Sequence, residues 1–404
     1  REEEENERIK EMIKEESSKS WLENFENYRY KRKLGEGAFG EVYSFTYNGE
    51  NTVVKKIKKK NKEANDKIKK EYIFLKNMQY PFTTYSKYKF EEDVYYYYIM
   101  MNNIEGQELW KYLWGKNGKD YYYKEKIKEC LRLFIHMIFI NYYFHTNGFI
   151  HLDIKPENYM IEEINGKQYI YGIDFGLSAC ISKKDTFLCN KDNNEASEEE
   201  PLNILRGTPE YIAYSMIKSQ DKLFQNYSDD YYATVLSFIF IYSGDFQLYF
   251  SHVYNKYIKS AFDLKNKLKD DEAVKSRKEL LIFISEKLPS KMKDIYNHFV
   301  VNNDIRNKKF NSLIEKIREN TRSEKQLYKE YHKEQILKAI GFFKNEFVEN
   351  YQDILNNIFN FIDKLSEEPA GYPVILNNNG NRVRYNTMIE KRDYLISMFE
   401  KLLK

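Results

Sequence analysis

Two short motifs in the middle of the chain carry side chains that could move a phosphoryl group. The first is HLDIKPEN at residues 151–158, and DFG follows from Asp174. In this arrangement one aspartate orients an attacking hydroxyl, a lysine neutralises the moving phosphate, and an asparagine and a second aspartate hold magnesium. Either triplet alone, HxD or DFG, occurs by chance in many chains. Together they indicate phosphoryl transfer, with Asp153 and Lys155 as the catalytic pair and Asn158 and Asp174 as magnesium ligands.

A glycine-rich segment lies upstream, LGEGAFGEV at residues 34–42. Backbone without side chains can approach phosphate oxygens closely, which is why phosphate-binding loops contain glycine. The segments on either side, 31–34 and 41–47, have the composition of strands, and Asn48-Gly49 is a hairpin-turn signal. A dinucleotide-binding fingerprint would need a helix after the glycines, and none is indicated. We therefore expect a phosphate-covering loop between two strands.

These motifs resemble those of eukaryotic protein kinases. The resemblance implies an α+β, two-lobed fold, with a small antiparallel-sheet lobe that has one key helix and a larger, mainly helical lobe. It also implies ATP and a magnesium ion (Mg2+) as cofactors. The expected parts are a charged flanking helix (1–27), a kinase domain (28–320, with small lobe 28–101, hinge 102–105 and large lobe 106–320), and a C-terminal helical extension (321–404) with a β-hairpin near 372–385.

The lysine that contacts phosphate has two candidates in NTVVKKI, residues 51–57. Alternation along a strand puts residues of equal parity on one face. In the kinase family the residue two before this lysine lies over adenine. Apolar Val53 suits that place and selects Lys55. Lys56 is then expected to point outward with the basic run 58–60.

A helix is expected next over residues 65–78, and the family pattern makes its Glu71 the ion-pair partner of Lys55. Its expected buried stripe is Ile68, Tyr72 and Leu75. Residues 94–101 then form an apolar segment of the kind seen in buried strands.

In the family register that strand ends at Met101 as the gatekeeper, with 102–104 as the hinge whose backbone pairs with the adenine edge. Val53 and Met160 would sandwich adenine, with Leu34 and Val42 above it. The resemblance implies a full set of ATP-binding residues: Leu34, Gly35, Glu36, Gly37, Ala38, Phe39, Gly40, Val42, Val53, Lys55, Glu71, Met101, Asn102, Ile104, Met160 and Asp174. Thr208, in GTPEY, would hydrogen-bond the Asp153 and Lys155 pair. The implied catalytic residues are therefore Asp153, Lys155, Asn158 and Thr208.

Two positions depart from the general kinase pattern. Leu152 occupies the place of the arginine that commonly grips an activation-loop phosphate, so we expect activity without that phosphate. The APE triplet is also absent, because residues 212–215 read IAYS. Between DFG and GTPEY, residues 183–203 are polar and acidic and lengthen the activation segment.

Weaker motifs are similar to those of the casein kinase I group, whose members also lack the APE glutamate. SDD at residues 228–230, with Gly244, matches the spacing of that group's DDLESLGY helix, although Val235 replaces a glycine. In this register Asp230 is the buried aspartate that braces the catalytic loop. Residues 288–292 and 309–313 resemble the group's FPSEF and PDYSYL segments.

Lys155, two residues after the aspartate, is the mark of kinases that act on serine or threonine of protein substrates. Two other classes stay open. A pseudokinase would have the fold without transfer, but such chains usually lose the equivalents of Lys55, Asp153 or Asp174. A small-molecule kinase shares the HxD loop, but it would lack Lys155 and the GTPEY segment.

Composition fits an intracellular enzyme, cytoplasmic or nuclear. The 404 residues carry a net charge of only +3, which gives no field that would argue for nucleic-acid binding. Three cysteines are too few for a disulfide framework. Apolar stretches at 130–144 and 231–250 are interrupted by polar residues and are expected as two buried helices, not membrane spans. The chain begins at Arg1 with no visible signal peptide, so we expect a piece of a longer protein.

The extension after residue 320 contains no catalytic motif. Its apolar residues recur at helical spacing over 321–364, Asn379-Gly380 marks a hairpin turn, and a last amphipathic helix carries Leu395 and Leu402. Because such faces need a surface to cover, we expect the extension to pack on the large lobe, with a regulatory or partner-binding role as the alternative.

Overall fold

The computed structural model contains two compact units, the first made of residues 1–78 and 84–104 and the second of 79–83 and 105–404. The boundary near Ile104 falls within the expected hinge. The described residues are 28–37, 40–47, 50–62, 65, 68–69, 71–72, 75, 91–115, 127–180, 207–213, 227–243, 271–319, 324–367, 374–376, 382–384 and 388–404. The expected helix at 1–27, the turn at 48–49 and the insert at 183–203 lie outside them.

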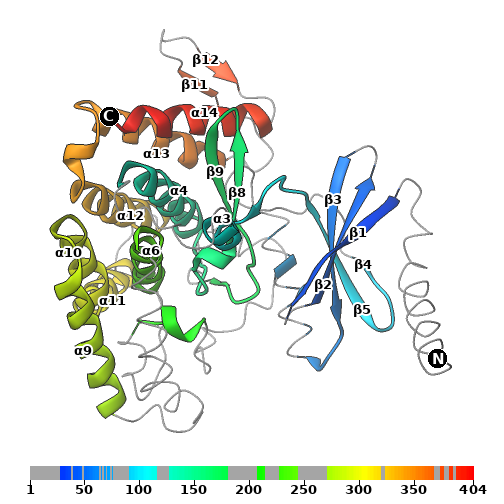
Figure 1. Ribbon diagram of the computed structural model, residues 1–404, viewed down its shortest axis with the longest axis horizontal. Coiled ribbons are helices and arrows are strands. Elements are labelled where there is room, and N and C mark those ends of the chain that lie inside the picture. The colour runs from blue at the N-terminus through cyan, green and yellow to red at the C-terminus, as the bar shows by residue number, and fades with distance from the viewer. Residues whose placement is uncertain are drawn as a thin grey trace. The chain divides into compact units, whose positions relative to one another are not determined.

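The first unit is built on one antiparallel sheet of five strands in the order β1-β2-β3-β5-β4 (Figure 1). The strands are β1 (Tyr28–Gly37), β2 (Gly40–Tyr47), β3 (Glu50–Lys58), β4 (Glu91–Glu92) and β5 (Tyr96–Asn102). One face forms a core of Phe45, Val54, Tyr98 and Met100, and this alternation along β3 leaves Val53 and Lys55 on the other face. The predicted strands on both sides of the glycines are confirmed, and no helix intervenes between β1 and β2.

Two details of the sheet differ from expectation. The buried strand begins at Tyr96, whereas Val94 and Tyr95 are 79% and 68% exposed. Asp93 Oδ1 accepts hydrogen bonds from the backbone N–H groups of Tyr95 and Tyr96, both at 2.7 Å, which turns the chain before the ladder begins.

Lys56 does not point into solvent. It is 6% exposed, with Nζ 3.4 Å from Glu41 Oε2 and 4.2 Å from the centre of the Tyr96 ring. Strand pairing places Glu41 directly opposite Lys56, so a carboxylate and an aromatic face cover a lysine whose stem is apolar.

The helix after β3 is described at 62, 65, 68–69, 71–72 and 75. Leu75 is 1% exposed, whereas Ile68 and Tyr72 are half-buried. The expected stripe is therefore fully buried only at Leu75.

Helices dominate the second unit. Its first half contains β6 (Gln107–Glu108), α3 (Leu109–Gly115), α4 (Ile127–Thr146), β7 (Phe149–Ile150), the 3-10 turn η1 (Pro156–Asn158), β8 (Tyr159–Ile164), β9 (Lys167–Gly172), β10 (Ala179–Cys180), the 3-10 turn η2 (Pro209–Tyr211) and α6 (Tyr227–Tyr242). Its second half contains α9 (Asp271–Lys287), α10 (Ser290–Tyr296), the π-helical turn η3 (Asn297–Val301), α11 (Asn303–Glu319), α12 (Glu324–Gly341), the 3-10 turn η4 (Lys344–Glu346), α13 (Tyr351–Glu367), β11 (Val374–Leu376), β12 (Arg382–Arg384) and α14 (Met388–Leu402).

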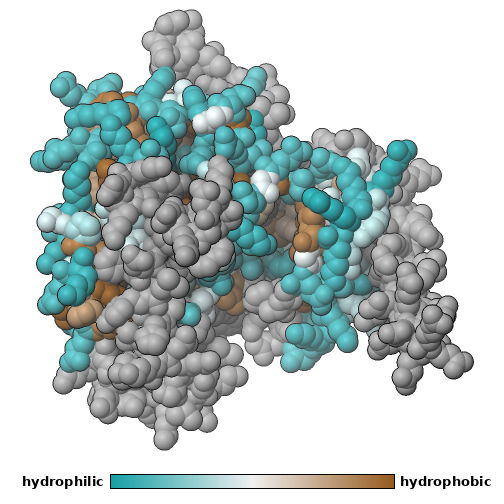
Figure 2. Space-filling model, in the orientation of Figure 1, coloured by the Kyte–Doolittle hydropathy of each residue, from teal (hydrophilic) through white to brown (hydrophobic). Residues whose placement is uncertain are grey.

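The two predicted buried helices correspond to α4 and α6, although α6 ends at Tyr242 and residues 244–250 of the second predicted stretch lie outside the described residues. Every residue of α6 is buried, and the Phe134 and Phe238 rings stack with centroids 4.3 Å apart. Helices that are apolar all round belong inside a protein, because no face of them favours water. The face in Figure 2 is accordingly mostly hydrophilic where residues are described. Within the described part of the chain, no helix has both the length and the apolar composition that a membrane crossing requires.

The C-terminal extension packs on α4, as predicted. The Phe139 ring lies 5.3 Å from the Phe359 ring of α13 and 5.6 Å from the Phe399 ring of α14. Strands β11 and β12 pair in antiparallel fashion, with Val374 opposite Arg384, so the predicted hairpin is present. The extension is therefore part of the second unit's core.

Candidate active site

Asp153 lies in the loop between β7 and η1, with two neighbours that sequence reasoning predicted. Thr208 donates its hydroxyl hydrogen to Asp153 Oδ1 at 2.5 Å, and Lys155 Nζ donates to Thr208 Oγ1 at 2.7 Å. Lys155 Nζ is also 3.6 Å from Asp153 Oδ2. The predicted contact of Thr208 with this pair is confirmed. The geometry demonstrates that the carboxylate can accept a hydrogen bond from an aliphatic hydroxyl beside a lysine.

Asn158 and Asp174 are brought together by the backbone. The Ile173 N–H donates to the Asn158 carbonyl at 3.0 Å, which places the next residue, Asp174, beside Asn158. Asn158 Nδ2 donates to Asp153 Oδ2 at 2.9 Å and to the Asp153 carbonyl at 2.7 Å. The other side of the amide, Oδ1, is therefore the atom that suits a cation.

Asp174 has φ 60°, in the left-handed region, and Gly176 donates its N–H to Oδ1 at 3.3 Å. One amide oxygen and one carboxylate fit Mg²⁺, which binds through one or two protein oxygens and takes its remaining ligands from phosphates and water.

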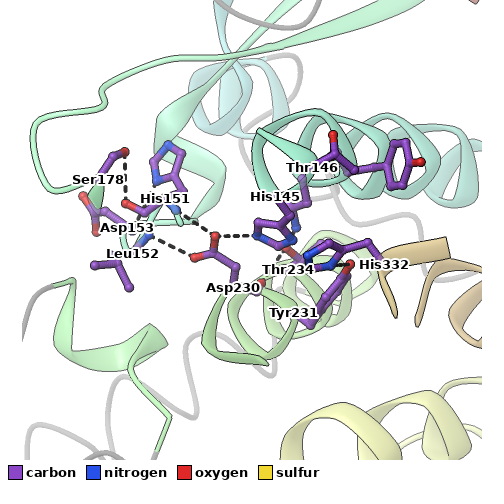
Figure 3. A network of polar contacts seen from close by, with 12 residues as sticks. His145, Thr146, His151, Leu152, Asp153, Ser178, Asp230, Tyr231, Thr234 and His332 are labelled. Carbon is purple, nitrogen blue, oxygen red and sulfur yellow. Dashed lines mark hydrogen bonds and ion pairs between the residues drawn. The ribbon is translucent and has the colours of Figure 1, made fainter. Parts of the chain in front are cut away.

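The backbone of the catalytic loop is held by Asp230 on α6 (Figure 3). The His151 N–H donates to Oδ2 at 2.7 Å and the Leu152 N–H donates to Oδ1 at 2.9 Å. Leu152 has φ 66°, which is uncommon for a leucine, so this double contact stabilises a strained turn. Gly207 packs against it, since a Cβ there would lie 2.6 Å from the Leu152 carbonyl oxygen. The predicted bracing role of Asp230 is borne out by these contacts.

His145 on α4 is a residue that the motif search missed. Its Nε2 lies 2.8 Å from Asp230 Oδ2. Burial lowers the pKa of His145, and the hydrogen bond to Asp230 acts in the opposite direction. The ring is therefore neutral, with Nε2–H as the donor to the carboxylate. A histidine six residues before the catalytic motif was the only sequence signal.

In the first unit, Lys55 and Glu71 form the predicted ion pair. Lys55 Nζ donates to Glu71 Oε1 at 2.6 Å, and both side chains are buried. Lys55 lies opposite Val42, and Val53 lies opposite Met101, so all four residues share one face of the sheet. Four of the residues predicted to bind ATP are therefore on one surface.

The glycines of the phosphate-covering segment have different surroundings. Gly40 has φ 132°, and a Cβ there would lie 2.3 Å from the Lys56 carbonyl oxygen, so β2 requires glycine at this position. At Gly35 nothing lies within 4 Å of the Cβ position, and Leu34 beside it is 44% exposed. Among the described residues, nothing therefore requires a glycine at position 35 in the way that the Lys56 carbonyl requires one at position 40.

The other predicted ATP-binding residues are distributed as follows. Glu36 is exposed and accepts a hydrogen bond from Lys33 Nζ at 2.8 Å. Asn102 is the last residue of β5, and Ile104, two residues later, is half-buried.

Met160 is half-buried on β8, in the second unit, whereas Val53 belongs to the first. Gly37 ends β1, and Ala38 and Phe39 lie outside the described residues. The role of these residues toward adenine and phosphate stays a prediction.

Known protein kinases are similar to this chain. The family model "Protein kinase domain" matches residues 28–304. The chain is 29% identical over 196 residues to a probable serine/threonine-protein kinase 2 of Plasmodium falciparum. It is 32% identical over 164 residues to a probable serine/threonine-protein kinase of Dictyostelium discoideum, and 32% identical over 184 residues to the carbon catabolite-derepressing protein kinase of Candida glabrata. These matches cover 47%, 39% and 43% of this chain and 33%, 23% and 28% of the relatives, so the chain spans a third or less of each relative's length.

Proposed function

Because the chain belongs to the protein kinase domain family, we propose that it is an ATP-dependent kinase that phosphorylates serine or threonine hydroxyls of proteins. The observation that carries this proposal is the contact between Asp153 Oδ1 and the Thr208 hydroxyl at 2.5 Å, with Lys155 Nζ 2.7 Å from that hydroxyl oxygen. A substrate hydroxyl needs the same two partners, a carboxylate that orients it and an ammonium group that neutralises the incoming phosphate.

Lys55, which Glu71 holds in place, would supply a second cation for the phosphates of ATP. Asn158 and Asp174 would hold Mg²⁺, which when bound would supply positive charge against the charge that develops on the phosphates. Positioning and charge stabilisation account for most of the catalysis expected of such a site.

A direct assay separates this proposal from its two rivals. The purified chain is incubated with ATP and Mg²⁺ in the presence of casein, a Ser/Thr peptide, choline or an aminoglycoside. We expect phosphate on casein and the peptide, and none from the Asp153→Asn variant. Transfer to the small alcohols alone would favour a small-molecule kinase. ATP binding without transfer to any acceptor would favour a pseudokinase.

Independence from activation-loop phosphate is part of the proposal. Leu152 offers no charge for a phosphate to neutralise, and its side chain is 7% exposed. Lys155, the cation two residues after Asp153, is already engaged by Thr208. The strained loop is braced by the Asp230 carboxylate, a contact that requires no phosphate.

A position near the casein kinase I group is a finer proposal. It is supported by the bracing contacts of Asp230, the residue that the group's motif selected. None of the three relatives named above carries that group's name. The resemblance to the group implies a preference for acidic or phosphorylated residues upstream of the target, so matched peptides with phosphoserine, aspartate or alanine at the same upstream position provide the test. Equal rates on all three peptides would contradict this placement without affecting the general activity.

A further inference from the structure

His332, on α12 of the C-terminal extension, lies outside the part of the chain that matches the kinase family, residues 28–304. Its side chain is completely buried in the second unit. Its Nδ1 lies 3.0 Å from the Tyr231 hydroxyl, and its ring centroid lies 4.5 Å from that of Tyr227. The extension therefore places a polar ring among residues of α6, the helix that carries Asp230.

The ring of His332 also packs on His145, with centroids 4.8 Å apart and planes tilted by 42° (Figure 3). His145 Nε2 in turn lies 2.8 Å from Asp230 Oδ2, and Asp230 holds the backbone of His151 and Leu152. An unbroken series of contacts thus runs from the extension to the residue before Asp153.

The Asp230 carboxylate accepts hydrogen bonds from two backbone N–H groups of the catalytic loop. Oδ2 receives two donors, His145 Nε2 and the His151 N–H, whereas Oδ1 receives the Leu152 N–H. Because Leu152 is held at φ 66°, a rotation of the carboxylate would release a backbone conformation that leucine does not favour. The His145 ring is therefore one of the three donors that this carboxylate has among the described residues.

Little besides packing fixes the His145 ring itself. Its Nδ1 is buried and has no hydrogen-bond partner among the described residues, so its contact with Asp230 is its one polar restraint there. Within the described part of the chain three rings surround it, Tyr227 at 4.7 Å, Tyr231 at 5.2 Å and His332 at 4.8 Å. The two tyrosines come from α6, and only His332 comes from outside the family-matched residues.

We propose that His332 is a positioning residue for the phosphoryl transfer proposed above: its ring holds His145 against Asp230 and so fixes the catalytic loop at His151–Asp153. This inference rests on the proposed function for its effect on rate, but its effect on the loop backbone does not. The C-terminal extension thereby contributes to the active site through contacts in the core, without touching substrate or ATP.

The test uses the full chain and three kinds of variant. His332→Asn keeps an acceptor near the position of Nδ1 for Tyr231 and removes the ring edge toward His145. His332→Phe restores a ring. The control is Ile358→Val or Ile358→Ala on α13, whichever lowers the melting temperature as much as His332→Asn does, since Ile358 is fully buried and outside the described contacts of the network.

Two measurements are made on each variant. In steady-state kinetics, we expect His332→Asn to lower kcat about tenfold with the KM for ATP within about twofold, because the lost interaction acts on the transition state. His332→Phe should recover most of the rate, and the Ile358 control should keep it. In hydrogen–deuterium exchange, the backbone amides of residues 151–153 should exchange faster in His332→Asn than in the control.

The two measurements separate this inference from the proposed function. If the wild-type chain transfers no phosphate to proteins, the proposed function fails and the exchange measurement still decides the role of His332. A folded His332→Asn variant with unchanged exchange at residues 151–153 would overturn the inference. The inference also fails if the Ile358 control loses as much rate and protection at equal melting temperature. If His332→Asn does not fold, His332→Phe is compared with the wild-type chain. Equal exchange at residues 151–153 supports the ring contact, and faster exchange in His332→Phe contradicts it.

Discussion

The Tyr142 hydroxyl donates a hydrogen bond to Asp363 Oδ1 across 2.7 Å, and this contact ties α13 of the extension to α4, the helix that leads into the catalytic loop. The same carboxylate receives Lys333 Nζ at 3.0 Å and has Lys329 Nζ at 3.8 Å. Burial raises the pKa of Tyr142 the most, and the negative charge of Asp363 raises it further. The phenol therefore stays protonated and is a donor throughout the usual pH range. A hydrogen bond to a charged carboxylate therefore joins the extension to α4 in addition to the aromatic rings, whereas the two lysines, both on α12, tie α12 to α13 within the extension.

We expect Asp363→Ala to destabilise the protein by about 2 kcal/mol, because it leaves a buried phenol and two lysines without their shared carboxylate. The measurement is the free energy of unfolding in urea. Asn357→Ala, at an exposed position of the same helix, is the control and should change stability by less than about 0.5 kcal/mol. Equal effects of the two variants would show that the carboxylate contributes nothing beyond its helix position.

Removal of the whole extension should destabilise the protein far more than Asp363→Ala does. A chain that ends at residue 320 would lose Phe359 and Phe399 and expose the ring of Phe139 on α4 to water. It would also lose Gln335, whose side-chain oxygen accepts a hydrogen bond from the buried guanidinium of Arg306. We expect an insoluble product or a strongly lowered melting temperature. A truncated chain as soluble and stable as the full one would mean that the extension is an independent module.

Two substitutions test the phosphate and metal contacts. Lys55→Met removes the cation that pairs with Glu71, and Asp174→Asn removes a predicted magnesium ligand. Each should fold and lose about a thousandfold or more in turnover, since each removes several kcal/mol of transition-state stabilisation. Lys56→Met is the matched control, because its side chain lies on the opposite face of β3 against Glu41 and Tyr96. Near-normal turnover in Lys55→Met, with loss in Lys56→Met, would reverse the assignment of the two lysines.

Four histidines, three of them buried and His298 half-buried, predict sensitivity to mild acid. Burial lowers the pKa of His136 to about 3, and burial followed by the charge of Arg306 lowers the pKa of His298 to about 4. Burial also lowers the pKa of His145 and of His332. An unfolded chain has histidine pKa values of about 6.5, so below that pH the unfolded state binds protons that the folded state excludes.

The stability that these neutral rings contribute is therefore complete above about pH 6.5 and is lost as pH falls toward 4. The free energy of unfolding can fall by at most about 1.4 kcal/mol per pH unit for each histidine. The measurement is the free energy of unfolding in urea between pH 7 and pH 5, where most exposed carboxylates remain ionised. A flat profile over that range would show that the histidines are not neutral in the folded protein.

Most of the candidate site could be predicted from motifs with fixed spacing. The ion pair of Lys55 with Glu71, the contact of Thr208 with Asp153 and the bracing by Asp230 could all be predicted, because each residue stands at a set place in an ordered pattern. The late start of β5 at Tyr96 was missed, although the local hydrogen bonds of Asp93 are of a kind that sequence can suggest.

Contacts of residues that stand in no such motif could not be predicted in this way. The cover over Lys56 depends on Tyr96 from a strand that pairs with β3, and one-dimensional alternation says only which face a side chain takes. The packing of His332 on His145 joins a helix without any motif to one that precedes the catalytic loop. Periodicity indicated that α12 needed a partner surface, but the identity of that surface is decided by tertiary packing.

Kinases with an arginine before the catalytic aspartate typically need a phosphate on the activation segment to neutralise that charge. Here the position holds Leu152, buried and fixed by its N–H contact with Asp230 at 2.9 Å. We expect phosphatase-treated protein to keep most of its turnover on a Ser/Thr peptide. Mass spectrometry must show that Thr186, Ser197 and Thr208 carry no phosphate, and Leu152→Arg is the matched variant that should create a dependence on phosphate. A loss of about tenfold or more in the wild-type chain, restored by rephosphorylation, would contradict the prediction and direct attention to another basic residue such as Arg206.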